Sequence, residues 1–187
     1  MKIDIFNTDK KYNIIYADPP WNFSSKELQK YKGNRFRPLE EVYNTEKTST
    51  MAEWDIGKIA DKDCALFMWT TDAHIEEALK LMKSWGFKYV TIAFIWSKIT
   101  KNGKRVSNLG AWTMKNCEIC LLGTKGRMLK YKKSNSVKQL FEAERTAHSK
   151  KTDCVRQFIE ELFGNIPRIE LFARQYADGW DCWGNEV

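Results

Sequence analysis

The sequence has no apolar run that could cross a membrane, because its longest uncharged apolar segments are only as long as β-strands. A membrane-spanning helix needs roughly 20 such residues in a row. The first residues, Met1 to Asp4, also lack the apolar core of a signal peptide. We therefore expect a cytoplasmic protein that makes no contact with a membrane.

The residues that build metal sites and disulfides are also scarce. There are two histidines, far apart, and five cysteines, an odd number that favours reduced thiols over a disulfide framework. Cys117 and Cys120 have C-x-x-C spacing, but they fall in an expected strand, where three positions reverse the face. No second cysteine pair completes a zinc site. We expect no metal ion.

A glycine-rich G-x-G loop is missing as well. Such loops bring the backbone close to the phosphates of a dinucleotide. Taken alone, this absence counts against an α/β fold that binds a nucleotide-like cofactor.

What is present describes an ordinary globular chain with an uneven charge. Its 187 residues, 43% hydrophobic and 29% charged, predict a single domain over 1–187. The net charge is +7, and the segment 98–138 holds eleven lysines and arginines against one acid, Glu118. Clustering of this kind suits the phosphates of a nucleic acid. We expect Lys130, Lys132 and Lys133 to be among the contacts.

Apolar segments of strand length alternate with amphipathic segments along the chain. Strands are predicted over 12–17, 64–70, 87–96, 117–123 and 168–173. Helices are predicted after the caps Asp72 and Asp153, and Thr50 to Glu53 fits a capping box that opens a short helix. Residues 22–50 are otherwise loop-like. This alternation predicts an α/β fold, with a mainly parallel sheet covered by helices on both faces.

The motif Asp18-Pro19-Pro20-Trp21 directly follows the first strand, where α/β sheets bind their ligands. It resembles the [DNS]-P-P-[YFW] catalytic motif of amino-methyltransferases, and its tryptophan ending is typical of those that act on adenine N6. The N6 lone pair of adenine is delocalised into the ring, so this amine is a poor nucleophile. A carboxylate and a backbone carbonyl that accept its two hydrogens help the nitrogen become tetrahedral and stabilise its developing charge. Two prolines would aim that carbonyl, and an aromatic ring would stack on the base. The alternative is a proline-stiffened turn with a core tryptophan.

Further segments extend this motif over nearly the whole chain. They are Tyr43-Asn44-Thr45, Met51, Leu66 to Thr70, Trp85-Gly86-Phe87, Trp96-Ser97-Lys98, Gly110, Glu118 to Gly126, His148 to Lys151, Glu170 to Arg174, Gly179-Trp180 and Gly184 to Glu186. In this order they resemble the MT-A70 family of adenine N6-methyltransferases, in its bacterial or prophage form. The resemblance implies a Rossmann-like class I methyltransferase fold with permuted motif order, and S-adenosylmethionine as cofactor.

The resemblance also implies the binding residues. Lys151 would face the cofactor carboxylate, and four residues would surround the ribose: Glu170, Arg174, Asn185 and Glu186. Asp4 and Ile5 would lie by the cofactor adenine, and Asp18 would lie close to the cofactor as well as to the base. Thr152 departs from the family pattern, which has proline there. Trp69, Trp96, Trp112 and Trp180 are expected to pack in the core or at its rim.

The implied reaction is methyl transfer to adenine N6 in a nucleic acid, as a monomer or homodimer. A small domain without an RNA-binding module favours DNA over RNA. Two alternatives stay open: an RNA adenine methyltransferase, and a catalytically silent nucleic-acid-binding subunit of the same fold. An intact Asp18 to Trp21 motif speaks against the silent subunit.

Overall fold

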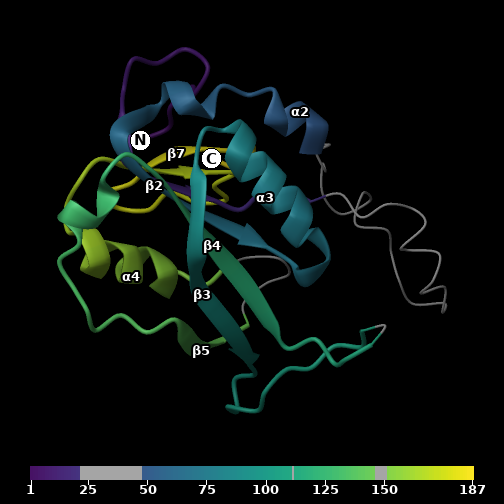
Figure 1. The fold of residues 1–187 in the computed structure, drawn as a ribbon. Helices are drawn as coiled ribbons and strands as arrows, with labels where there is room; N and C mark the ends of the chain where they lie inside the picture. The colour runs from purple at the N-terminus through teal and green to yellow at the C-terminus, as the bar shows by residue number, and fades with distance from the viewer. Residues whose placement is uncertain (22–47, 111, 146–150) are drawn as a thin grey trace.

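The computed structural model describes residues 1–21, 48–110, 112–145 and 151–187. Within these residues one sheet of seven strands has the order β5-β3-β4-β2-β1-β6-β7 (Figure 1). The strands are β1 (Tyr12–Ala17), β2 (Ala60–Thr70), β3 (Lys88–Ile99), β4 (Cys117–Lys125), β5 (Leu140–Glu144), β6 (Arg168–Leu171) and β7 (Asp181–Trp183). The helices are α2 (Thr48–Ala52), α3 (Ile75–Ser84) and α4 (Cys154–Phe163), with single 3₁₀ turns at η2 (Ile56–Lys58), η3 (Asp72–His74) and η4 (Met128–Tyr131).

The sheet is mixed. Pairing is parallel for β1 with β2 and β6, for β6 with β7, and for β3 with β5, whereas β4 runs antiparallel to both of its neighbours. In the described residues, β4 is thus the one strand that opposes the common direction. The other strands all end on the same side of the sheet, where β4 begins. We call this row of strand ends the carboxyl edge, and the opposite row of strand ends the amino edge.

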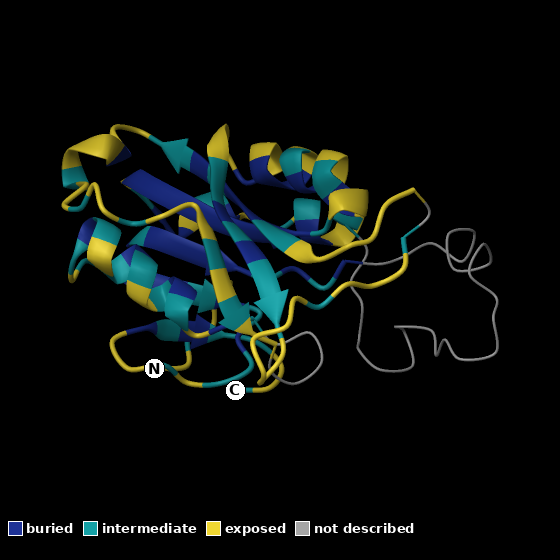
Figure 2. Cartoon of the chain, turned by 90° about the horizontal axis from the view of Figure 1, so that it is seen from below, coloured by how far each residue is buried: buried dark blue, intermediate teal, exposed yellow. Residues whose placement is uncertain are grey.

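Helices cover both faces, as the sequence predicts. Alternate residues of a strand point to opposite faces, so Ile15 joins the core under α3, whereas Ile14 joins the core under α4. The central strand β2 is buried on both faces over residues 63–70 (Figure 2). Burial on two sides explains why its residues 64–69 are continuously apolar instead of alternating. The fold therefore holds the end of β1 rigidly between two cores.

The α3 helix shows how local sequence sets the boundaries. Ala78, Leu81 and Met82 share its buried face, and its N-terminal turn carries two acids that suit the helix dipole. Gly86 follows with a φ of 83°, the left-handed conformation that ends many helices. The indole of Trp85 donates to the carbonyl of Met51 at 2.8 Å and so ties α3 to α2.

Two capping predictions are wrong, and the third holds in part. Thr50 lies inside α2, so the segment from Thr50 ends a helix instead of opening one. Asp72 sits within η3 and forms an ion pair with Lys115 at 3.0 Å. Asp153 is the N-cap residue of α4 as predicted, but its side chain makes no capping hydrogen bond and accepts from the side chains of Arg156 and Gln175.

Two edge strands, β5 and β7, were not expected from the sequence. The β5 strand reads LFEAE and alternates in burial, and β7 has three residues, so neither forms a long apolar run. Residues 1–3 pair along β7, with the amide of Ile3 donating to the carbonyl of Cys182 at 2.9 Å. Of the expected loop over 22–50, residues 22–47 lie outside the described residues, whereas residues 48–50 are helical and belong to α2.

In the part of the chain that the structure describes, no helix is long and apolar enough to cross a membrane. Cys117 is exposed and Cys120 is buried, as expected for two residues three positions apart on a strand. The described residues hold no cluster of three or more histidine, cysteine or acidic side chains arranged for a metal ion.

Candidate active site

Asp18 is the first residue beyond β1, at the carboxyl edge between the ends of β2 and β6. Its amide donates to the carbonyl of Leu171 at 3.5 Å, which extends the pairing of β1 with β6 by one residue. The two prolines then turn the chain, and the amide of Trp21 donates back to the carbonyl of Pro19 at 2.9 Å. The motif thus forms a stiff turn that holds the carboxylate at the strand end.

A chain of opposite charges begins at Asp18. The ammonium group of Lys151 contacts both carboxylate oxygens of Asp18 at 2.9 Å, and it also contacts Glu118 at 3.2 Å. Glu118, the second residue of β4, pairs in turn with Lys98 of β3. The side chains of Asp18, Lys151 and Glu118 are 22%, 16% and 18% exposed, so water screens these charges poorly.

Burial and neighbouring charges have opposite effects on the pKa values of these three side chains. Burial raises the pKa of Asp18, and the ammonium of Lys151 offsets this only in part. Burial also opposes the charge of Glu118, but Lys151 and Lys98 outweigh it and lower the pKa of Glu118. Burial likewise disfavours the charged form of Lys151, yet Asp18 and Glu118 outweigh it and raise the pKa of Lys151. The lysine is therefore firmly charged and supports an ionised Asp18.

Trp21 is 7% exposed and belongs to the core under α3. Its ring stacks on His74, with centroids 5.8 Å apart and an interplanar angle of 18°. Its indole donates to the carbonyl of Trp69 at 3.0 Å. The predicted stacking of Trp21 on a base stays a prediction. The contacts show that this side chain also has a substantial part in the fold.

A second set of charges lies beyond Asp18 at the carboxyl edge. Arg156 of α4 pairs with Glu170 of β6 at 2.8 Å and also contacts Asp153, and Gln175 donates to Asp153 at 2.9 Å. Burial raises the pKa of Glu170 to about 7, although the guanidinium of Arg156 opposes this. Glu170 therefore takes up or loses a proton near neutral pH.

Phe172 joins β6 to this edge in an unusual conformation. Its φ is 61°, and among the described residues no other non-glycine residue has a positive φ. A bulky residue in this region is an outlier that its surroundings must stabilise. The ring of Phe172 stacks on Trp54 at 5.7 Å and meets Trp183 edge-on at 5.5 Å. These aromatic contacts hold the turn after β6 in place.

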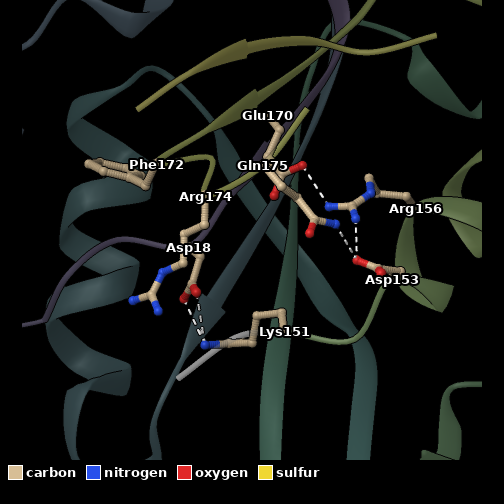
Figure 3. A pocket seen from close by; sticks show the side chains of 8 residues that line it. All are labelled: Asp18, Lys151, Asp153, Arg156, Glu170, Phe172, Arg174 and Gln175. Atoms are coloured by element: carbon tan, nitrogen blue, oxygen red, sulfur yellow. Dashed lines mark hydrogen bonds and ion pairs between the residues drawn. The ribbon is translucent and has the colours of Figure 1, made fainter. Parts of the chain in front are cut away.

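These side chains converge on one pocket (Figure 3). The lining residues are Asp18, Lys151, Asp153, Arg156, Glu170, Phe172, Arg174 and Gln175. Figure 3 shows the Asp18–Lys151 pair and the Glu170–Arg156–Asp153 group as two separate sets of charges. The pocket thus joins residues from three regions of the sequence at the carboxyl edge.

Only some of the predicted binding residues line this pocket. Asp18, Lys151, Glu170 and Arg174 do, whereas Asp4, Ile5, Asn185 and Glu186 do not. Glu186 lies nearby, 3.5 Å from Arg174 in an ion pair, and Asn185 is exposed. Ile5 is buried in the core, and the exposed Asp4 accepts a hydrogen bond from the amide of Phe6 at 3.0 Å.

Sequence reasoning missed four lining residues. Two of them, Asp153 and Arg156, lie three positions apart, the spacing of neighbours on one helix face, and this signal could have shown their pairing. Phe172 is part of the segment Glu170 to Arg174 that carries the family resemblance, so the resemblance could have predicted that it lines the pocket. Nothing in the sequence marked Gln175. The resembling segments Tyr43 to Thr45 and His148 to Lys150 lie outside the described residues.

The basic segment 98–138 does not form one patch. Its first part, up to Lys115, lies at the carboxyl edge, but β4 then carries the chain across the sheet. The turn η4 therefore lies at the opposite edge, and Figure 1 shows it far from the β3–β4 connection. There Lys130 pairs with Asp63 at 2.6 Å. The expected phosphate contacts at Lys130, Lys132 and Lys133 are thus separated from the pocket.

The comparisons with known proteins show the family of the chain. The MT-A70 family model matches residues 12–186, and the chain belongs to this family. A type II methyltransferase, M.MunI of Mycoplasma sp, is 36% identical over 95% of this chain and 78% of its own length. Human N(6)-adenine-specific methyltransferase METTL4 is 26% identical over 98% of this chain but only 39% of its own length. An MT-A70-like N(6)-adenosine-methyltransferase of Arabidopsis thaliana is 26% identical over 100% of this chain and 25% of its own length.

Family and relatives together identify the chain as an N6-adenine methyltransferase of nucleic acid. The motif Asp18 to Trp21, which first indicated this chemistry, lies within the matched residues, and its Asp18 lines the pocket.

Proposed function

We propose that this protein transfers the methyl group of S-adenosylmethionine to the N6 amine of adenine in DNA. The observation that carries the proposal is the Asp18 carboxylate, held at the end of a central strand by Lys151 and facing a pocket. The acceptor nitrogen needs a fixed hydrogen-bond acceptor beside it, and a carboxylate at a rigid strand end supplies one. The cofactor, when bound, supplies the electrophilic methyl group.

The charges of the pocket fit this cofactor. The ammonium of Lys151 lies between Asp18 and Glu118 and lines the pocket, so it would also face the cofactor carboxylate, as the family resemblance implies. Glu170, at the other set of charges, would accept hydrogens from the ribose hydroxyls. We extend the ribose contacts to Arg174, Asn185 and Glu186 and the adenine contacts to Asp4 and Ile5, as the family resemblance implies. No metal ion takes part, so methyl transfer should persist in a strong chelator.

Asp18 would act in two stages. Before transfer it accepts one N6 hydrogen, and the carbonyl of Pro19 accepts the other through its second lone pair, because the first already takes the amide of Trp21. After transfer the nitrogen carries a positive charge and must lose a proton. Because burial raises the pKa of Asp18, this carboxylate is a better proton acceptor than an exposed aspartate.

The fold supports the same reading. The strand that carries Asp18 comes first in the chain and lies beside β6, which carries Glu170. We infer a Rossmann-like class I methyltransferase in which the catalytic motif precedes the cofactor-associated strand, the permuted order. The assembly is proposed to be a monomer or a homodimer.

Similarity to known relatives favours DNA over RNA as the substrate. The bacterial type II methyltransferase is 36% identical, whereas a fungal protein named as an RNA methyltransferase is 26% identical and shares 52% of its length with this chain. Mass spectrometry of nucleosides from DNA and RNA of an expressing host tests this. N6-methyladenine in DNA above the level of an Asp18→Asn host supports the proposal. The same increase only in RNA overturns the choice of DNA.

A silent binding subunit is the second candidate function. Calorimetric titration with S-adenosylmethionine and a methyl-transfer assay on the purified chain separate the two. An active enzyme binds the cofactor and methylates alone. A silent subunit shows neither result without a partner.

A further inference from the structure

The connection between β3 and β4 projects from the carboxyl edge (Figure 2). It first turns at Gly103, and the amide of Val106 then donates to the carbonyl of Lys98 at 2.8 Å. Next, Asn108 and Lys115 exchange two backbone hydrogen bonds of 2.7 and 2.8 Å. This exchange closes a second loop, and we call its described residues, 109, 110 and 112–114, the hairpin tip.

The hairpin tip presents large apolar side chains to water. Trp112 is 98% exposed, Leu109 is 84% exposed and Met114 is 53% exposed. This result differs from the expectation that Trp112 packs in the core or at its rim. A cluster of exposed apolar side chains usually marks an interaction site.

The backbone of the tip is tightly built. A Cβ on Gly110 would lie 2.3 Å from the carbonyl oxygen of Thr113, so the loop closes only with glycine at this position. The chain therefore holds the exposed side chains on a compact turn with a paired base.

The charge around the tip indicates what it meets. Residues 100–117 contain Lys101, Lys104, Arg105 and Lys115 and no acid. Two copies of so basic a hairpin would repel each other, whereas the phosphates of a nucleic acid would attract it. The combination of flanking cations and an apolar tip fits a duplex, because apolar wedges enter between base steps while cations contact the backbone.

The base of the hairpin is tied directly to the site. Lys98 and Glu118, at the ends of the two strands, form an ion pair, and Glu118 contacts Lys151, the partner of Asp18. On the other side, Lys115 pairs with Asp72 after β2 at 3.0 Å. A duplex that brings an adenine to Asp18 therefore lies beside this hairpin.

We propose that the hairpin tip is a wedge that enters the DNA duplex at the target adenine. Trp112 fills the space that the adenine leaves in the stack, and the flanking cations contact phosphates. This inference rests on the proposed function. A base inside a duplex must leave its stack before it can react, and a ring in the vacated space offsets the lost stacking.

The experiment compares two forms of one probe. Initial rates of tritiated methyl transfer are measured on unmethylated phage genomic DNA, as native duplex and after heat denaturation. Trp112→Ala is compared with the wild type, with Trp112→Phe, and with Tyr89→Ala, which truncates an exposed aromatic near the other end of β3. Permanganate oxidation of thymines left unstacked opposite the adenine gives a second readout.

We expect Trp112→Ala to slow methylation of the duplex about tenfold or more and to leave the rate on denatured DNA within about threefold, because only the duplex must be opened. Permanganate reactivity falls in parallel, Trp112→Phe restores both, and Tyr89→Ala changes neither. An unchanged duplex rate and reactivity, or an equal loss on both DNA forms with unchanged reactivity, overturns the wedge.

Two further results separate other failures. If the wild type methylates neither form of DNA, the proposed function fails and the wedge fails with it. If sedimentation shows a wild-type dimer that Trp112→Ala converts to a monomer, the tip is a contact between copies and the wedge is wrong.

Discussion

The two edges of the sheet each hold an aspartate paired with a lysine, but the surroundings of the two pairs differ. At the amino edge, where the parallel strands begin, Asp63 is buried, but its partner Lys130 is half-exposed, and the amide of Arg127 also donates to Asp63 at 2.6 Å. These bonds lower the pKa of Asp63 and raise that of Lys130. At the carboxyl edge both Asp18 and Lys151 are largely buried, and burial raises the pKa of Asp18 despite the lysine.

We infer from this difference that the Asp63–Lys130 pair serves the fold, whereas the Asp18–Lys151 pair serves the proposed chemistry. Asp63 is satisfied by backbone and side-chain donors, and Gly126 lets the chain pass close to it, because a Cβ there would lie 2.4 Å from its carboxylate. Asp18 pairs with the side chain of Lys151 and faces a pocket. A carboxylate at a pocket with a raised pKa is suited to a reacting amine.

The largest effect should come from removing the two aspartate charges in turn. Asp18→Asn keeps the shape but removes the charge that stabilises the developing ammonium, so single-turnover methylation should fall roughly 10²–10³-fold. Asp63→Asn should lower the melting temperature and leave the rate within about twofold, since its bonds belong to the fold. Single-turnover kinetics and thermal melts on both variants test this. A near wild-type rate in Asp18→Asn contradicts the mechanism.

Substitutions of the two lysines, Lys151 and Lys130, should also differ in their effects. Lys151→Gln removes the cation that we propose faces the cofactor carboxylate, so the dissociation constant for S-adenosylmethionine should rise about tenfold or more. Without this ammonium the pKa of Asp18 rises further, so turnover of the variant should fall as the pH is lowered, over a range where the wild type changes less.

Lys130→Gln is the matched control, because it removes the same charge at the other edge. It should leave cofactor affinity and the pH profile as in the wild type. Titration calorimetry and pH–rate profiles measure both quantities. Equal losses of affinity in the two variants would remove the distinction between the edges.

A smaller effect concerns the basic segment. Lys101→Gln with Lys104→Gln removes two cations beside the site, so the slope of log binding constant against log salt should flatten by about 2. The triple change Lys130→Gln, Lys132→Gln and Lys133→Gln removes more charge at the amino edge and should leave the slope unchanged. Binding titrations on phage DNA at several salt concentrations decide it. A flattened slope only in the triple variant would instead support the prediction from sequence that Lys130, Lys132 and Lys133 contact phosphates.

The smallest effect should be a few-fold change of cofactor affinity with pH. Because the pKa of Glu170 is about 7, its carboxylate is mostly protonated at pH 6 and mostly ionised at pH 8. An ionised carboxylate accepts ribose hydroxyl hydrogens better, so affinity should rise as the pH rises through 7. Glu170→Gln should bind more weakly at pH 8 and lose this dependence. A rise of equal size in the variant would assign the titration to another group.

The elements predicted best from sequence are the apolar strands near the middle of the sheet. The predictions for β1, β2, β3 and β4 differ from the structure only at the strand ends, although the first residues of β3 are exposed. The edge strands β5 and β7 were not predicted, because each is short and neither forms a long apolar run. A sequence pattern does not show in which direction a strand runs. The sequence therefore could not predict that β4, which is antiparallel to its neighbours, carries the basic segment from one edge of the sheet to the other.

The candidate site was predicted where residue type alone determines a role. Asp18 and Lys151 were named from the motif and the resemblance, and the structure pairs them at 2.9 Å. Arg156 was missed because its role comes from a tertiary contact with Glu170 across a helix and a strand. Trp21 was assigned to the base, whereas its hydrogen bond to Trp69 depends on packing that no linear pattern shows.

The positive φ of Phe172 links the pocket to residues that touch no ligand. A non-glycine residue in the left-handed region costs about 1–2 kcal/mol, a sizeable share of the 5–15 kcal/mol that typically stabilise a domain. Trp54 and Trp183 hold the ring and so maintain the costly backbone. Loosening either aromatic contact would release the turn and displace one wall of the pocket. The sensitivity of this enzyme to mutation therefore extends through the aromatic contacts to side chains well outside its lining.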